Sequence, residues 1–153
     1  MSNTYTQVHI QFVFAVKYRK AQLLPAFKTE LLKYITSIIQ KHTHKLLAIN
    51  CEPDHIHIFI GMRPTQSISD LMKEVKASSS GWINARNFLP VKFEWQGGYG
   101  AFAYHKNQVP GVIVYIHKQE IHHTKTTFIE EYIEFLKEHD IDYEEQFIFR
   151  GMI

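Results

Sequence analysis

The stretch that decides the fold is Pro53-Asp54-His55-Ile56-His57-Ile58-Phe59-Ile60. A turn-forming Pro-Asp pair leads into branched and aromatic residues, which predicts a β-strand. Side chains alternate between the two faces of a strand, so the three isoleucines share one face and His55, His57 and Phe59 share the other. The isoleucine face predicts a core. The two imidazoles lie about 6–7 Å apart along the backbone, close enough to bind one metal ion, although most His-x-His pairs are surface or packing features.

Length and composition predict one soluble domain that spans residues 1–153. The sequence has no apolar stretch long enough for a membrane helix and no secretion signal, so we expect a bacterial or archaeal cytoplasmic protein. The single cysteine, Cys51, excludes an internal disulfide and is expected to be a packed thiol. A net charge of +2 does not by itself indicate a nucleic-acid-binding protein.

Hydrophobic periodicity on both sides of the histidine strand predicts five further elements of a sheet-and-helix fold and two helices after them. Strands are expected at about 5–16, 46–52, 55–62 and 99–104, and helices at about 25–42, 67–83, 108–120 and 127–139. We expect a weak point in the second helix at 78–81, where three serines precede a glycine. The acidic segment from 140 to 145 is followed by Phe147, Ile148 and Phe149, which are expected to pack on the domain.

The first six elements follow the strand-helix-strand-strand-helix-strand order of a ferredoxin-like fold. We therefore predict an α+β protein with a βαββαβ antiparallel sheet and two additional C-terminal helices. In this arrangement the first and third strands lie at the centre of the sheet, and the first two helices cover one face. The other face is expected to be an exposed polar surface that carries Gln7, His9 and Gln11 beside His55 and His57.

The first C-terminal helix carries the residues that could complete a site. Tyr115 and Gln119 are four positions apart, so they project from one face of a helix, and His122 extends that face if the helix continues. A solvent-exposed Tyr-Gln pair is the ordinary interpretation. In the functional interpretation, the Gln119 amide oxygen is a third metal ligand and Tyr115 is a nucleophile beside the metal.

Three motifs now stand in a defined order: His55-Ile56-His57, Trp95-Gln96-Gly97-Gly98-Tyr99-Gly100-Ala101-Phe102, and the run from Tyr115 to His123. Together they resemble the single-tyrosine HUH transposases of small bacterial insertion sequences, the TnpA type of the IS200-like family. The resemblance spans nearly the whole chain. It implies that Tyr115 is the catalytic nucleophile and that His55, His57 and Gln119 bind the metal. This chain has Lys118 where many relatives have asparagine, which affects local substrate contacts.

The resemblance also implies a substrate and an assembly. The substrate is single-stranded DNA with a hairpin near each end of the element. The protein is a homodimer in which the tyrosine of one chain serves the histidines of the other.

The candidate residues suit phosphodiester chemistry. Two imidazoles and one amide add no charge to a divalent metal, and no thiolate is present to form a structural zinc site, so Mg²⁺ or Mn²⁺ is expected. Attack of Tyr115 on phosphorus gives a 5′-phosphotyrosine and a free 3′-hydroxyl, and rejoining needs no nucleotide cofactor. A phenol with a pKa near 10 is about one part in a thousand ionised at pH 7, so its activation requires roughly 4 kcal/mol. The sequence does not identify a general base.

Candidate DNA-binding residues are cations and polar or aromatic side chains near these motifs: Lys17, Arg19, Lys20, Arg63, Lys73, Lys76, Trp95 and Gln96. At least three of the five aromatic residues Phe93, Trp95, Tyr99, Phe102 and Tyr104 are expected to belong to the core. Two other functions stay open at this point. One is a non-catalytic ferredoxin-like nucleic-acid-binding protein, a decayed or domesticated relative. The other is a small metal-dependent hydrolase that uses water as its nucleophile.

Overall fold

The structure is a computed structural model that describes residues 3–122 and 126–144 of the chain. The strands are β1 (His9–Ala15), β2 (Lys45–Glu52), β3 (His55–Gly61) and β4 (Gly100–Tyr104). The α-helices are α1 (Pro25–Lys41), α2 (Ile68–Ala85), α3 (Val109–His117), α4 (Gln119–His122) and α5 (Phe128–Glu138). Two short 3₁₀ segments are η1 (Lys17–Arg19) and η2 (Lys106–Gln108).

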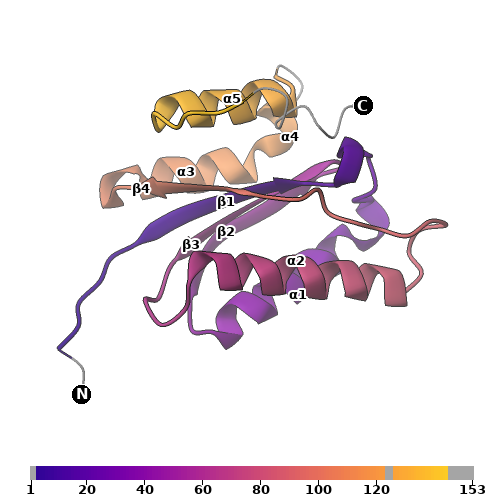
Figure 1. Cartoon of the computed structure of the whole chain (residues 1–153), viewed down its shortest axis with the longest axis horizontal. Coiled ribbons are helices and arrows are strands. Elements are labelled where there is room, and N and C mark those ends of the chain that lie inside the picture. The colour runs from indigo at the N-terminus through magenta and orange to yellow at the C-terminus, as the bar shows by residue number, and fades with distance from the viewer. Residues whose placement is uncertain (1–2, 123–125, 145–153) are drawn as a thin grey trace.

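The four strands form one antiparallel sheet in the order β2-β3-β1-β4, which confirms the ferredoxin-like prediction. β1 and β3 are central, and their register places Val13 opposite His57 and Ala15 opposite His55. Helices α1 and α2 cover one face of the sheet, as Figure 1 shows. The histidine strand is therefore held between neighbours on both sides, which fixes the direction of its side chains.

The main core lies between the sheet and helices α1 and α2. Phe12 of β1 and the isoleucines of β3 face this layer, and Leu31 and Ile35 of α1 pack there without solvent exposure. Full burial of each such side chain contributes about 1.5–3 kcal/mol. Apolar residues thus alternate along β1 and β3 because one face of the sheet packs on α1 and α2.

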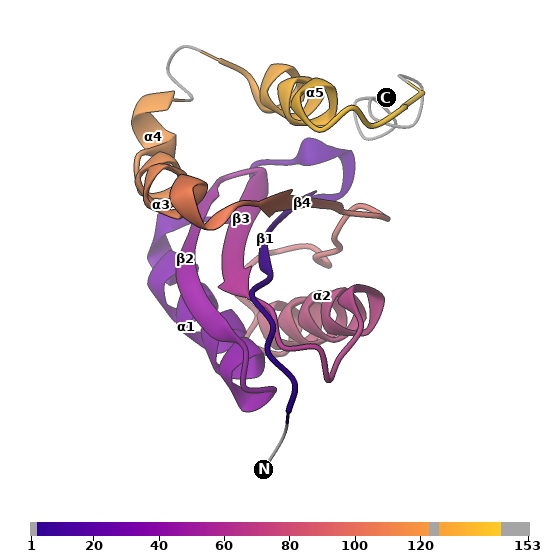
Figure 2. The ribbon, with the colours of Figure 1, turned by 90° about the vertical axis from the view of Figure 1, so that its left-hand side faces the viewer.

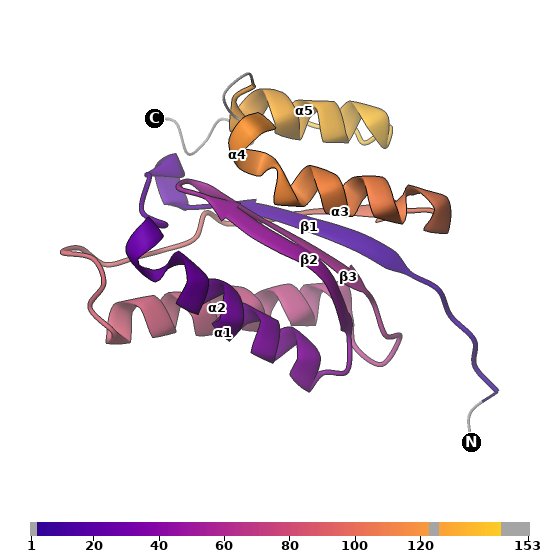
Figure 3. The same ribbon diagram turned by 180° about the vertical axis from the view of Figure 1, so that it is seen from behind.

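The opposite face of the sheet is also covered, which corrects the prediction of an exposed polar surface. Helix α3 packs Val112 and Ile116 on the β2–β3 side, and α5 packs Phe135 and Leu136 on the β1–β4 side. Figures 2 and 3 show these C-terminal helices on the face that α1 and α2 leave open. The polar residues of this face are consequently buried, and Gln11 is 0% exposed.

Several boundaries differ from those predicted. β1 begins at His9, where its pairing with Gly61 of β3 begins, instead of near residue 5. Helix α2 runs without a break through residues 78–81, where the Ser79 hydroxyl donates to the Val75 carbonyl oxygen at 2.6 Å. The helix predicted over 108–120 is divided at Lys118, whose φ of −101° and ψ of 22° are not helical.

The helix starts are as predicted. The Ser67 hydroxyl accepts a hydrogen bond from the Asp70 backbone N–H, and the Thr127 hydroxyl caps α5 in the same way. Cys51 is buried, as expected, and burial raises the pKa of its thiol to about 11. The aromatic segment from residue 147 to 149 lies outside the described residues. Among the described helices, none has the length and apolar character needed to cross a membrane.

Candidate active site

Two buried histidines of β3 form the centre of the site. The His55 and His57 ring centroids are 5.1 Å apart, and the residues are 1% and 0% exposed. Each ring is oriented through Nδ1: His55 contacts Asp54 Oδ1 at 2.7 Å, and His57 contacts Gln11 Oε1 at 2.7 Å. With an oxygen acceptor at Nδ1, the Nε2 atom of each neutral ring is left to bind a metal.

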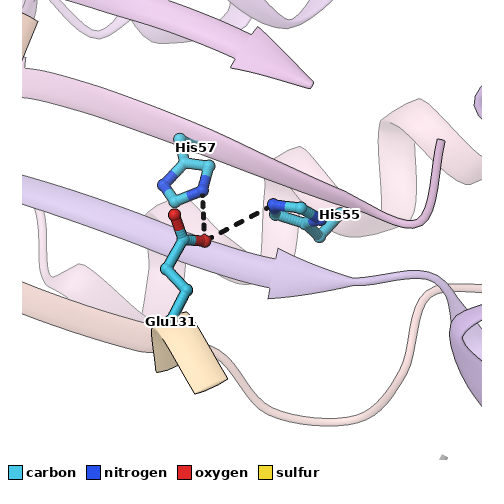
Figure 4. Close-up of side chains that lie close together, drawn as sticks. All are labelled: His55, His57 and Glu131. Atoms are coloured by element: carbon cyan, nitrogen blue, oxygen red, sulfur yellow. Dashed lines mark hydrogen bonds and ion pairs between the residues drawn. The ribbon is translucent and has the colours of Figure 1, made fainter. Parts of the chain in front are cut away.

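A carboxylate from α5 meets both Nε2 atoms (Figure 4). Glu131 Oε1 lies 3.0 Å from His57 Nε2 and 3.5 Å from His55 Nε2, and Glu131 is 1% exposed. Potential ligand atoms of the three residues all lie within 4.8 Å of one another. Adjacent ligands of an octahedral ion with bonds near 2.1 Å are separated by about 3.0 Å. The cluster can therefore hold a divalent metal ion.

Tyr115 and Gln119 reach the same carboxylate from the other side. The Tyr115 hydroxyl donates to Glu131 Oε2, and Gln119 Nε2 donates to the same oxygen at 3.3 Å. His122 Nε2 lies 3.3 Å from Oε2. The structure thus brings the predicted tyrosine, glutamine and histidines together, and it does so within one chain.

Burial and the neighbouring charge control protonation in this site. Burial opposes a charge on His55, but its hydrogen bonds to Asp54 and Glu131 outweigh that effect and raise its pKa. Burial and the nearby Glu131 carboxylate raise the pKa of Tyr115, so the phenol is held in its neutral form. A bound cation would oppose this carboxylate charge.

A cavity of about 270 Å³ reaches the tyrosine from the groove between α3 and α5. Tyr115 and Glu131 line it together with Gln11 and Tyr104. The Gln11 amide nitrogen donates to the Tyr104 hydroxyl at 3.1 Å. Gln11, whose amide oxygen contacts His57 Nδ1, therefore connects this histidine to Tyr104 in the cavity wall. The tyrosine and the carboxylate that accepts from it therefore both face accessible space.

Sequence reasoning missed Glu131. The predicted donor set of two imidazoles and one amide carries no charge and stays a prediction; the structure places a carboxylate in the same cluster. The apolar face of α5 carries Phe128, Tyr132 and Phe135, and Glu131 falls among them at helical spacing. An acidic residue within an apolar helix face was the signal that could have revealed it.

Four of the eight predicted DNA-binding residues line one surface pocket of about 730 Å³: Lys17, Lys76, Trp95 and Gln96. Trp95 is 9% exposed and its Nε1 donates to the Ser79 hydroxyl at 2.9 Å, so most of this side chain belongs to the core, and its contact with DNA stays a prediction. Phe93 and Phe102 are buried as well, which confirms that at least three of the five aromatic residues belong to the core. Tyr99 is 37% exposed.

Several predicted cations already have partners in the protein. Lys76 donates to the carbonyl oxygens of Gln96 and Gly98 at 2.7 Å and 2.6 Å, and burial lowers its pKa. Lys17 pairs with Glu94 at 2.9 Å, and Arg63 Nε donates to the Thr43 carbonyl oxygen at 3.3 Å. The remaining candidates lie at least partly open to solvent: Arg19, Lys20, Lys73 and Gln96.

The chain resembles known transposases in both sequence and structure. The sequence profile of the family described as "Transposase IS200 like" matches residues 4–119. The ISDra2 transposase TnpA of Deinococcus radiodurans is 26% identical over 74 residues, which are 48% of this chain and 53% of that protein. The chain thus matches about half the length of this curated relative.

Two solved structures share the fold. A crystal structure of a transposase from Deinococcus radiodurans superposes with a TM-score of 0.63 at 20% identity, covering 78% of this chain and 95% of the other. A REP-associated tyrosine transposase bound to a REP hairpin gives a TM-score of 0.61 at 17% identity, covering 80% and 73%.

Proposed function

This chain belongs to the IS200-like transposase family, and we propose that it cleaves and rejoins single-stranded DNA through a 5′-phosphotyrosine on Tyr115. The observation that supports this mechanism is the position of the Tyr115 hydroxyl. It faces a cavity on one side and, through one carboxylate, is linked to the paired histidines on the other. A tyrosine that served only packing would not need either connection.

The proposed reaction conserves the number of phosphodiester bonds. The phenolic oxygen of Tyr115 forms a bond to phosphorus, and the bond from phosphorus to the 3′-oxygen breaks. The phenolic proton leaves toward Glu131 Oε2, the acceptor of the Tyr115 hydrogen bond, and a proton ends on the departing 3′-hydroxyl. Attack by a new 3′-hydroxyl reverses these changes and joins the strands without a nucleotide cofactor.

We propose that the site uses Mg²⁺ or Mn²⁺ and that His55 and His57 bind it; Gln119, the third ligand that the resemblance implies, lies in the same cluster. The buried histidine and carboxylate donors suit a divalent ion, which would polarise the scissile phosphate when bound. The side chains themselves are held ready, because Asp54 and Gln11 fix the two imidazole rings.

Single-stranded DNA with a hairpin is the proposed substrate. One relative of this fold has been solved with a REP hairpin, which supports a hairpin here. The predicted contacts that remain at least partly open to solvent are Arg19, Lys20, Lys73 and Gln96. We propose a homodimer from the resemblance, but with each tyrosine serving its own chain, because Tyr115 and His57 of one chain have ring centroids 6.1 Å apart.

The test is to incubate the protein with single-stranded DNA that carries its own flanking sequences, with Mn²⁺ or Mg²⁺ present. We expect a protein–DNA band that survives denaturation and disappears in Tyr115→Phe. DNA binding that is unchanged in Tyr115→Phe, with no covalent band from either protein, would indicate a binding protein instead. Cleaved product without a covalent band would indicate a hydrolase.

A further inference from the structure

We propose that Glu131 of α5 is the third protein ligand of the metal centre and, through its second oxygen, the residue that positions Tyr115. The resemblance assigns the third ligand to Gln119, so the structure and the resemblance differ here. The assignment of Glu131 as a metal ligand depends only on the positions of the side chains. The positioning part rests on the proposed function, because it takes Tyr115 as the nucleophile.

The two oxygens of Glu131 have different partners. Oε1 faces the Nε2 atoms of His57 and His55 at 3.0 Å and 3.5 Å, separations that ligands of one ion would have. Oε2 accepts from the Tyr115 hydroxyl. One carboxylate thus spans from the predicted metal position to the predicted nucleophile.

Gln119 is oriented differently. Its amide nitrogen, Nε2, donates to Glu131 Oε2 at 3.3 Å and lies 3.4 Å from the Tyr115 carbonyl oxygen. An ionised carboxylate only accepts hydrogen bonds, so the amide presents its nitrogen to Glu131 and not its oxygen. Gln119 therefore supports the carboxylate, and the ligand oxygen is supplied by Glu131.

The setting of Glu131 also favours a functional role. The residue is 1% exposed in a helix face formed by Phe128 and Phe135, where an unpaired carboxylate would be strongly destabilising. Its polar partners come from β3, α3 and α4, so the one side chain joins three separate elements to α5. An apolar residue would pack in this face without needing those partners.

The experiment measures Mn²⁺ binding without DNA, by the electron paramagnetic resonance signal of free Mn²⁺, for wild type and three variants. We expect Glu131→Gln to weaken binding by about 100-fold or more, since altering even residues that support metal ligands costs about 10–100-fold. Gln119→Ala should weaken Mn²⁺ binding by less than about tenfold. Glu30→Gln, the same change at an exposed position of α1 on the other side of the sheet, should bind as wild type does.

Thermal melting by circular dichroism accompanies each measurement. If Glu131→Gln does not fold, Glu131→Asp takes its place, because it keeps the charge while withdrawing it by one methylene. Binding that falls more in Gln119→Ala than in the Glu131 variant, or wild-type binding by that variant, overturns the ligand assignment.

The positioning role is tested at saturating Mn²⁺ by the rate of covalent band formation. A lower rate in a folded, metal-loaded Glu131→Asp protein supports the role, and a wild-type rate overturns it. If wild type forms no band at all, the proposed function and the positioning role fail together. The Mn²⁺ affinities would still decide the ligand assignment.

Discussion

Asp54 offers the sharpest test of how the protein prepares its metal centre. Its Oδ1 is 2.7 Å from His55 Nδ1, and no metal ligand needs to be removed to disturb this contact. Asp54→Ala leaves Nδ1 without its acceptor, so the ring can take either tautomer and rotate. Asp54→Asn keeps an oxygen acceptor in the same place and removes only the charge.

The expected losses follow from that difference. Removing a partner that orients a metal-bound histidine weakens metal affinity about 10–100-fold, or about 1.4–2.8 kcal/mol. The loss of metal affinity in Asp54→Ala should lie within that range, and the loss in Asp54→Asn should lie near or below its lower end. Isothermal titration with Mn²⁺ measures both, and Asp70→Asn, an acidic residue in the first turn of α2, is the control. Wild-type affinity in Asp54→Ala would refute the claim that this contact fixes the ring.

Three further results are expected. In metal-free protein the pKa of His55 is raised above 6.5 and that of Asp54 is lowered, so their pairing stabilises the fold between the acid range and neutrality. Urea unfolding should therefore show stability falling as the pH rises from about 6 through the raised pKa of His55, with a flatter profile in Asp54→Asn; equal slopes would contradict this. A mixture of Tyr115→Phe and His55→Ala proteins should not recover covalent band formation, because Glu131 of one chain contacts both Tyr115 and His55 of that chain; recovered activity would show that tyrosines are exchanged between chains. Cys51 should resist a thiol-reactive dye at pH 8 until the chain unfolds, since it is 1% exposed with a pKa of about 11; rapid labelling of folded protein would contradict its burial.

The sheet was predictable because its strands alternate. Phe12 and Ile58 point into one core and are cross-strand neighbours, as the two-residue period of each strand requires. The continuity of helix α2 was less predictable. Local propensity marks 78–81 as a weak point, but Ser79 satisfies its hydroxyl within the helix and accepts from buried Trp95.

The candidate site was only partly visible in the sequence. His55 and His57 are two apart on one strand, and Tyr115 and Gln119 are four apart on the helical segment, so each pair is a local pattern. Glu131 joins the pairs from a helix whose docking depends on tertiary packing, and no local spacing relates it to them. The burial of the sheet face that carries the histidines was not predicted for the same reason, because the sequence does not show where α5 packs.

The central claim is that Tyr115 carries the DNA. The most direct measurement is tryptic mapping of the covalent complex by mass spectrometry, after the DNA has been trimmed to a short remnant. Tyr115 is the only tyrosine in the tryptic peptide 107–118, whereas Tyr132 lies in 126–137. The account predicts a 5′-linked nucleotide on peptide 107–118. A remnant on peptide 126–137, or one linked through a 3′-phosphate, would contradict it.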